Sequence, residues 1–260
     1  MAALRKIATY HCTALVGSNK TGSLKPDEDG YYTLCIGALN AFNNTGAFYP
    51  GERAKALFEE SGSLMRRIRN GNCKGETGHP KKLPGQSMQE YLQRILQIEE
   101  TRVCCHFKDI WLQEDMKDGD GRTIIGIIAK VKPSGPMGHA LKESIENPHE
   151  NVCFSIRSLT HDTASPAGYL QKELRNIITF DLVTEPGLSG SVKWNSPALE
   201  SMINDIITYD DIKSMEDYRL SSPLGLESSQ QLFEEVLSTF ESLPEEPSKP
   251  KKEKPLSFYW

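Results

Sequence analysis

Two short stretches of this sequence supply a histidine and a serine, the residue types that make a general base and a nucleophile. The first is Gly78-His79-Pro80, and the second runs from Asn151 to Ser158. A serine hydroxyl is a poor nucleophile unless an adjacent base, most often a histidine, lies within hydrogen-bond reach. We therefore expect His79 to activate Ser155 for an acyl-transfer reaction.

The residues around Ser155 have the alternating pattern of a β-strand, in which successive side chains point to opposite faces. One face would carry apolar side chains, and the other would carry Ser155 with Arg157. Arg157 would then be placed to position a water or backbone donor for the tetrahedral oxyanion. Its alternative interpretation is a salt bridge on an edge strand.

A third candidate, Asp181, lies on a predicted strand over residues 177–184, with Thr179 and Val183 on its own face. A carboxylate in such an apolar setting needs a partner, because burying an unpaired charge is costly. The His79 ring is a suitable partner, since a carboxylate orients a catalytic imidazole and stabilises its protonated form. We therefore favour Asp181 as the third catalytic residue.

These candidate residues are expected on a framework of strands interrupted by helices, without a regular βαβ alternation. Strands are expected over 31–38, 105–112, 123–131, 152–159 and 177–184, and helices over 52–60, 87–96 and 138–145. Ser87 and Glu90 form a capping-box pattern at the start of the second helix. The order predicts an α+β fold, either an antiparallel domain or a mainly antiparallel β-barrel core surrounded by helices.

The chain divides into an N-terminal segment (1–30), a catalytic domain (31–190), a helical extension (191–242) and a tail (243–260) rich in proline, lysine and glutamate. Such a composition does not bury enough apolar surface to order itself, so the tail is expected to be flexible. We expect the chain after about Ser222 to be dispensable for folding.

Composition excludes several classes of function. The 260 residues are 38% hydrophobic and 25% charged, and no apolar run approaches the roughly 20 residues that span a bilayer. A net charge of −5 with dispersed basic residues gives no support to nucleic-acid binding. Six cysteines without CxxC spacing, and the lack of an HExxH motif, argue against a metal hydrolase built on His79 and His106. We expect no membrane, no metal and no cofactor.

Six separated motifs, in this order, resemble those of the prohead core proteases of tailed bacteriophages, which are related to the herpesvirus protease assemblin. They are Asn44-Thr45-Gly46 with Tyr49-Pro50, Gly75-Glu76-Thr77-Gly78-His79-Pro80, Arg102 to Trp111, Gly135-Pro136-Met137-Gly138, Phe154-Ser155-Ile156-Arg157, and Phe180 to Pro186. The sequence departs from the family pattern at Ser158, where a glycine usually follows the arginine. It also has Ile156 in place of a common second serine, which leaves Ser155 as the only hydroxyl at the two central positions.

The resemblance implies an assemblin-like serine endopeptidase that works without a cofactor inside the prohead, in the host cytoplasm. Its expected substrates are scaffold and major capsid proteins, and it is expected to form a homo-oligomer. The resemblance also implies self-cleavage after glutamate, for example at Leu232-Phe233-Glu234 or Leu243-Pro244-Glu245. Because the viral relatives use a second histidine, His106 is the rival third residue. A non-catalytic scaffold or core protein that keeps the protease fold is the alternative function.

Overall fold

The computed structural model describes residues 4–5, 7–17, 24–43, 45–59, 62–118, 121–147, 149–184, 204–221, 227–244 and 246–247. Its strands are β1 (Leu4–Arg5), β2 (Ile7–Gly17), β3 (Tyr32–Leu39), β4 (Ala41–Phe42), β5 (Phe48–Tyr49), β6 (Lys74–Glu76), β7 (Val103–Lys117), β8 (Thr123–Pro133), β9 (Val152–Ala164), β10 (Leu170–Val183), β11 (Asn204–Thr208) and β12 (Glu246–Pro247). Its α-helices are α1 (Gly51–Ala54), α2 (Ser63–Arg69), α3 (Met88–Leu96), α4 (Gly138–Glu146), α5 (Tyr209–Ser221) and α6 (Glu227–Ser242), and two short 3₁₀ helices are η1 (Lys55–Phe58) and η2 (Glu100–Arg102).

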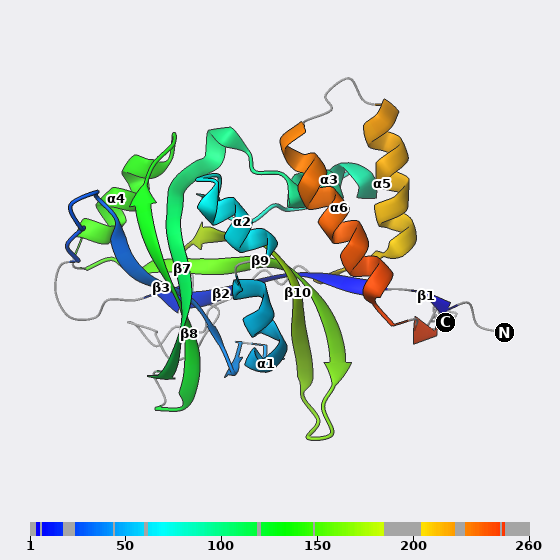
Figure 1. Ribbon diagram of the computed structural model, residues 1–260, viewed down its shortest axis with the longest axis horizontal. Coiled ribbons are helices and arrows are strands. Elements are labelled where there is room, and N and C mark those ends of the chain that lie inside the picture. Colours follow the sequence, from blue (N-terminus) through cyan, green and yellow to red (C-terminus); the bar gives the residue numbers. More distant parts are fainter. Residues whose placement is uncertain are drawn as a thin grey trace, which may run out of the picture.

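The long strands form two sheets (Figure 1). One has the order β11-β2-β9-β10-β5-β4 and the other the order β3-β8-β7-β6, while β1 pairs with β12 separately. Strand pairing is antiparallel throughout these sheets, except where β10 meets β5. The α+β class with antiparallel sheets is therefore confirmed. The barrel is not: within the described residues the strands divide between separate sheets and close no barrel.

Strand β9 lies in the middle of its sheet, between β2 and β10. It pairs with β10 from Cys153 to Ala164 and with β2 from Val152 to Thr160. Its first ten residues are all buried, because the strand is covered on both faces. The partner strand β2 comes from the segment before residue 31, which carried no strand prediction, so the N-terminal region builds the sheet beside the predicted nucleophile.

The first core lies between the sheets and is built around three phenylalanines. Phe107 of β7 contacts Phe154 of β9 and Phe180 of β10, with ring centroids 6.0 and 5.8 Å apart in edge-to-face geometry. All three side chains are fully buried. Edge-to-face pairs of this kind add to the free energy gained from apolar burial. The apolar alternation of β9 and β10 thus fixes which residues face the opposite sheet and which face the helices.

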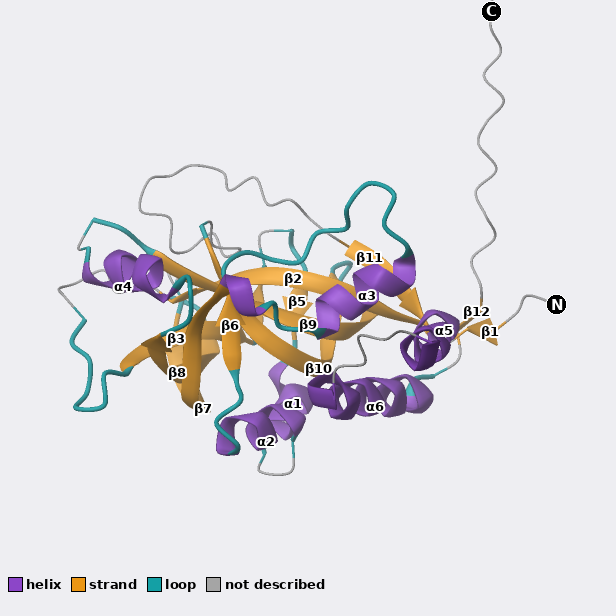
Figure 2. Ribbon diagram, turned by 90° about the horizontal axis from the view of Figure 1, so that it is seen from above, coloured by secondary structure: helices purple, strands orange, loops and turns teal. Residues whose placement is uncertain are grey.

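The second core lies beneath the helices α3, α5 and α6, which group together beside β9 and β10 in Figure 1. Leu159 and Ile178 contribute to it from the sheet, and Phe233, Val236 and Phe240 contribute from α6. Seen from above, α4 and the α5–α6 pair lie at opposite ends of the strands (Figure 2). The buried core residues that α6 supplies argue against the expectation that everything after about Ser222 is dispensable for folding.

The end of the predicted tail that is described is also held in place. Leu243 is buried in the second core, and Glu246–Pro247 forms β12 against β1. The rest of the tail, residues 248–260, lies outside the described residues, so its predicted flexibility stays a prediction.

Most predicted elements occur, with longer strands than expected. The capping box of α3 is confirmed: Ser87 Oγ accepts from the Glu90 N–H, and the Glu90 carboxylate accepts from the Ser87 N–H. The predicted helix over 52–60 is broken into α1 and the 3₁₀ helix η1.

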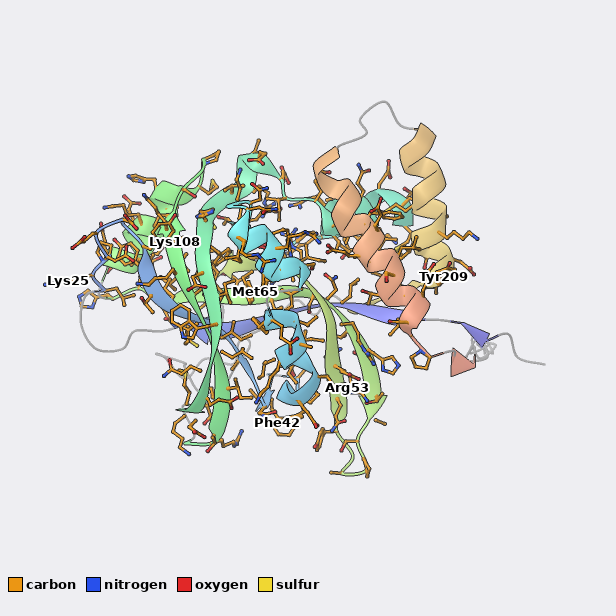
Figure 3. The ribbon with its side chains drawn as sticks, in the orientation of Figure 1. Lys25, Phe42, Arg53, Met65, Lys108 and Tyr209 are labelled. Carbon is orange, nitrogen blue, oxygen red and sulfur yellow. The ribbon has the colours of Figure 1, made fainter. Side chains whose placement is uncertain are left out.

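At the far end of the β9–β10 hairpin, Phe42 contacts Tyr169, and Arg53 of α1 pairs with Glu173 of β10 (Figure 3).

Candidate active site

His79 lies in the loop that follows β6, and backbone contacts hold this loop against the end of β10. The Gly78 N–H donates to the Leu182 carbonyl at 2.7 Å, and the Thr77 N–H donates to the Arg102 carbonyl at 2.9 Å. Gly78 has a φ of +71°, a conformation that favours glycine. The loop therefore brings His79 beside the residue that precedes Leu182, which is Asp181.

The His79 ring and the Asp181 carboxylate are in contact. His79 Nδ1 lies 3.1 Å from Asp181 Oδ2, and the exposed fractions of the two side chains are 17% and 0%. With a proton on Nδ1, the ring donates to the carboxylate, and Nε2 is then the nitrogen that takes up a proton as a base. The structure thus brings together the two residues whose partnership was predicted, although they are separated by more than 100 positions.

Asp181 is held as a carboxylate by the charge next to it. Burial raises the pKa of this carboxyl group, but the Arg157 charge and the His79 contact lower the pKa further, and the net pKa lies below its ordinary value. Arg157 binds both carboxylate oxygens, with Nε 2.9 Å from Oδ2 and Nη2 2.7 Å from Oδ1. This bidentate geometry leaves Oδ2 shared between Arg157 and His79.

Ser155 is the direct cross-strand partner of Asp181, on the neighbouring strand β9. Directly opposed residues of an antiparallel pair lie on the same face with Cβ atoms about 4.5–5.5 Å apart. Ser155 Oγ is fully buried and, among the described residues, has no hydrogen-bond partner. A buried hydroxyl without a partner costs about 1–3 kcal/mol, and such groups in native structures often mark functional sites.

The other nucleophilic side chain on this part of β9 is not activated. Cys153 lies two residues before Ser155, and burial raises the pKa of its thiol to about 12. Because the thiolate is the reactive form, this cysteine stays a neutral thiol at physiological pH.

Arg157 shares the Ser155 face, as predicted, but its guanidinium is directed at acidic partners and at α3. Besides Asp181, it contacts the Glu76 carboxylate, with Nη2 3.3 Å from Oε2. Nη1 donates to the Ile95 and Gln97 carbonyls at the C-terminal end of α3, at 3.2 and 3.3 Å. The side chain is fully buried. These contacts place Arg157 behind Asp181, whereas the sequence pattern had suggested a role at the oxyanion.

His106, the rival third residue, lies elsewhere. Its Nδ1 is 3.1 Å from the Tyr31 hydroxyl, and its Nε2 is 3.1 Å from the Gly71 carbonyl. In the β6–β7 ladder, His106 is the cross-strand partner of Lys74. The structure therefore places Asp181, and not His106, against the His79 ring.

Sequence reasoning assigned no function to Glu76, which the structure places in the same charged network. Glu76 is fully buried and accepts hydrogen bonds from Arg94, Arg157 and the Glu99 N–H. A signal was available, because Glu76 lies only three residues before the candidate base, in the short strand β6. Among the described residues, no group of three or more His, Cys, Asp or Glu side chains has the arrangement of a metal site, and no helix is long and apolar enough to cross a membrane.

Comparison with known proteins places this chain in a family. The model of the peptidase S80 family matches residues 10–238, a range that contains Ser155, His79 and Asp181. This chain belongs to the peptidase S80 family. The capsid maturation protease of Pseudomonas phage phiKZ is 42% identical to this S80 peptidase over 191 residues, which cover 72% of this chain and 69% of the phiKZ protein.

A solved structure, that of the capsid assembly protease of bacteriophage T4, aligns with 68% of the S80 peptidase and 98% of the T4 chain. The sequence identity is 14% and the TM-score is 0.43.

Proposed function

We propose that this S80 peptidase is a serine endopeptidase in which Ser155 is the nucleophile, His79 the general base and Asp181 the residue that orients His79. The observation that carries the proposal is the 3.1 Å contact between His79 Nδ1 and an Asp181 carboxylate whose strand partner is Ser155. Three separate segments of the chain, on β9, on β10 and after β6, meet at this point.

The chemistry follows from these positions. Ser155 Oγ attacks the scissile carbonyl carbon while His79 Nε2 takes the hydroxyl proton, and Asp181 stabilises the imidazolium that forms. The tetrahedral intermediate collapses with cleavage of the C–N bond, and His79 returns the proton to the leaving amine. Water then attacks the acyl-enzyme with His79 again as base, which releases the acid product and restores Ser155.

Among the residues that the structure describes, Ser155 Oγ has no hydrogen-bond partner, so the catalytic hydrogen bond to His79 has to form when substrate binds. Catalytic hydrogen bonds are often long or absent in unliganded enzymes and tighten in the substrate complex. Since the hydroxyl is fully buried, productive binding of a peptide also has to expose it.

The proposed substrates are the scaffold and major capsid proteins of a phage prohead, cut inside the immature capsid, where the enzyme would act as a homo-oligomer. The 42% identity to a capsid maturation protease supports this assignment. The test is processing of co-expressed capsid and scaffold proteins by the wild-type enzyme and by two matched variants. Ser155→Ala should abolish cleavage, because losing a triad nucleophile costs about 10⁶ in kcat.

Ser158→Ala is the matched control, because it removes the same hydroxyl from a buried position three residues further along β9. It should cleave at close to the wild-type rate. Processing by Ser155→Ala would end the assignment of the nucleophile. Normal particle assembly without cleavage by the wild-type protein would favour the non-catalytic scaffold function instead.

Self-cleavage is a further part of the proposal, and the structure adds a condition to it. Leu232-Phe233-Glu234 lies in the helix α6, and Phe233 is buried. Because a protease binds its substrate as an extended strand, α6 has to open before this site is cut. At Leu243-Pro244-Glu245, Leu243 is also buried. Mass spectrometry of concentrated wild-type protein should show trimming at these sites that Ser155→Ala lacks, and equal trimming in both proteins would refute self-processing.

A further inference from the structure

We infer that Glu76 is a positioning residue that controls the protonation of His79 through Arg157 and Asp181. The inference rests on the proposed function for the assignment of His79 as the base. The new element is a second buried carboxylate, three residues before His79 in the sequence, whose charge acts on the His79–Asp181 pair.

The first support is the burial and complete engagement of Glu76. Arg94 binds both of its oxygens, with Nη1 3.1 Å from Oε1 and Nη2 2.5 Å from Oε2. The Glu99 N–H donates to Oε1 at 2.7 Å. A carboxylate that is fully buried and bonded to two arginines and one backbone N–H is held in one position.

The second support is the way in which Arg157 is shared. Nη2 of this arginine lies 2.7 Å from Asp181 Oδ1 and 3.3 Å from Glu76 Oε2, so one nitrogen contacts both carboxylates. The carbonyls at the end of α3 accept hydrogen bonds from its Nη1. The guanidinium is therefore fixed from the Glu76 side, and through its two bonds to Asp181 it fixes the oxygen that contacts His79.

The third support is the charge balance. Asp181, Glu76, Arg157 and Arg94 carry two negative and two positive charges, which cancel. When His79 accepts the Ser155 proton, it adds a positive charge beside a buried site whose charges are otherwise balanced. Because charges interact strongly where water is excluded, loss of the Glu76 charge leaves an excess positive charge that disfavours the imidazolium.

Other charged groups around the His79 loop have to be considered with these four. The Arg102 guanidinium donates to the Thr77 carbonyl, and a Cβ at Gly78 would lie 2.8 Å from its Nη2, so Arg102 adds a positive charge beside the loop. Glu99 lies 3.1 Å from Arg94 at the more exposed edge of the network. Neither contacts the Asp181 carboxylate in the structure, and both are unchanged in the variants below.

The test measures the titration of the His79 ring by NMR in the full-length protein, with its signals assigned from a His79→Gln variant. Glu76→Gln should lower the titration midpoint of His79 by about one pH unit, because a nearby negative charge is lost. Arg94→Gln should raise the midpoint, because a nearby positive charge is lost. Opposite shifts from two partners of one ion pair are the signature of an electrostatic role, which a purely structural role would not produce.

Glu100→Gln is the matched control, because Glu100 is an exposed glutamate on the neighbouring η2 that pairs only with Lys74 in the described contacts. It should leave the His79 midpoint unchanged. If Glu76→Gln does not fold, the upward shift in Arg94→Gln still decides the question. An unchanged midpoint in Glu76→Gln, a lowered one in Arg94→Gln, or an equal shift in Glu100→Gln would overturn the inference. This readout requires no catalysis, so it stays separate from a failure of the serine mechanism.

Discussion

One oxygen atom of Asp181 contacts both His79 and Arg157: Oδ2 lies 3.1 Å from His79 Nδ1 and 2.9 Å from Arg157 Nε. The arginine keeps the carboxylate ionised in a place where burial alone would favour the neutral acid. The histidine therefore meets a charged partner, which is the condition for stabilising an imidazolium during catalysis.

Asp181→Asn should lower kcat by about 10⁴ with little change in KM, because the amide no longer holds His79 in the required tautomer or stabilises its charge. The variant also leaves Arg157 without one of its two buried counter-charges, so its stability should fall. Kinetics therefore have to be normalised to the concentration of active sites, measured from the acyl-enzyme burst.

His106→Ala should reduce kcat much less than Asp181→Asn does. His106 contacts the Tyr31 hydroxyl and the Gly71 carbonyl, and neither group belongs to the catalytic site. The two variants should be compared on the same purified peptide substrate. The reverse ranking would transfer the third catalytic function from Asp181 to His106.

Acid should destabilise the wild-type protein in part through Asp181. The pKa of its carboxyl is lower in the folded protein than its ordinary value, so ionised Asp181 contributes stability above the ordinary pKa of an aspartate. That contribution is lost as the pH falls through the lower, folded pKa. Urea unfolding of wild-type and Asp181→Asn proteins should therefore show a difference in unfolding free energy that shrinks below about pH 4. A difference that stayed constant down to acid pH would contradict this account.

Gly78→Ala should lower activity more than it lowers stability. Gly78 has a φ of +71°, and an added Cβ would lie 2.8 Å from Arg102 Nη2. The strain falls on the loop that carries His79, so the ring should move away from Asp181. Gly85→Ala is a useful control, since Gly85 has a φ of +80° with no atom near its added Cβ. Equal losses of kcat/KM in both variants would show that position 78 is not special.

Phe240→Ala in α6 should destabilise the protein by about 3–5 kcal/mol, the usual cost of removing a buried phenylalanine. Phe240 is fully buried in the second core, whereas Ser238, two residues away, is exposed. Ser238→Ala should change the unfolding free energy by less than about 0.5 kcal/mol. Thermal or urea unfolding of both variants measures the contrast, and a stable Phe240→Ala protein would restore the view that the C-terminal region is dispensable.

The sequence was informative where chemistry and periodicity coincide in a short segment. The alternation around Ser155 and the capping box at Ser87 each specify local structure, and each was found. The pairing of His79 with Asp181 was predicted because a buried carboxylate needs a partner. That requirement does not depend on the fold.

The parts that sequence reasoning missed depend on contacts between distant segments. Strand β2 is rich in β-branched and aromatic residues but was not predicted, and its place beside β9 is set by tertiary pairing. Glu76 and Arg157 are 81 positions apart, so neither residue type alone revealed the ion pair. Residues 191–242 were predicted as a helical extension, and Phe233, Val236 and Phe240 recur at helical spacing within α6, but only the packing of this helix shows that they belong to a core.

The most direct test of the central claim is mapping of a serine-directed phosphonate adduct on the full-length protein by mass spectrometry. We expect one adduct, on Ser155, that forms in the wild-type and Ser158→Ala proteins, is absent from Ser155→Ala and forms far more slowly in His79→Ala. An adduct on another residue, or proteolytic activity in a protein that the phosphonate does not label, would contradict the account.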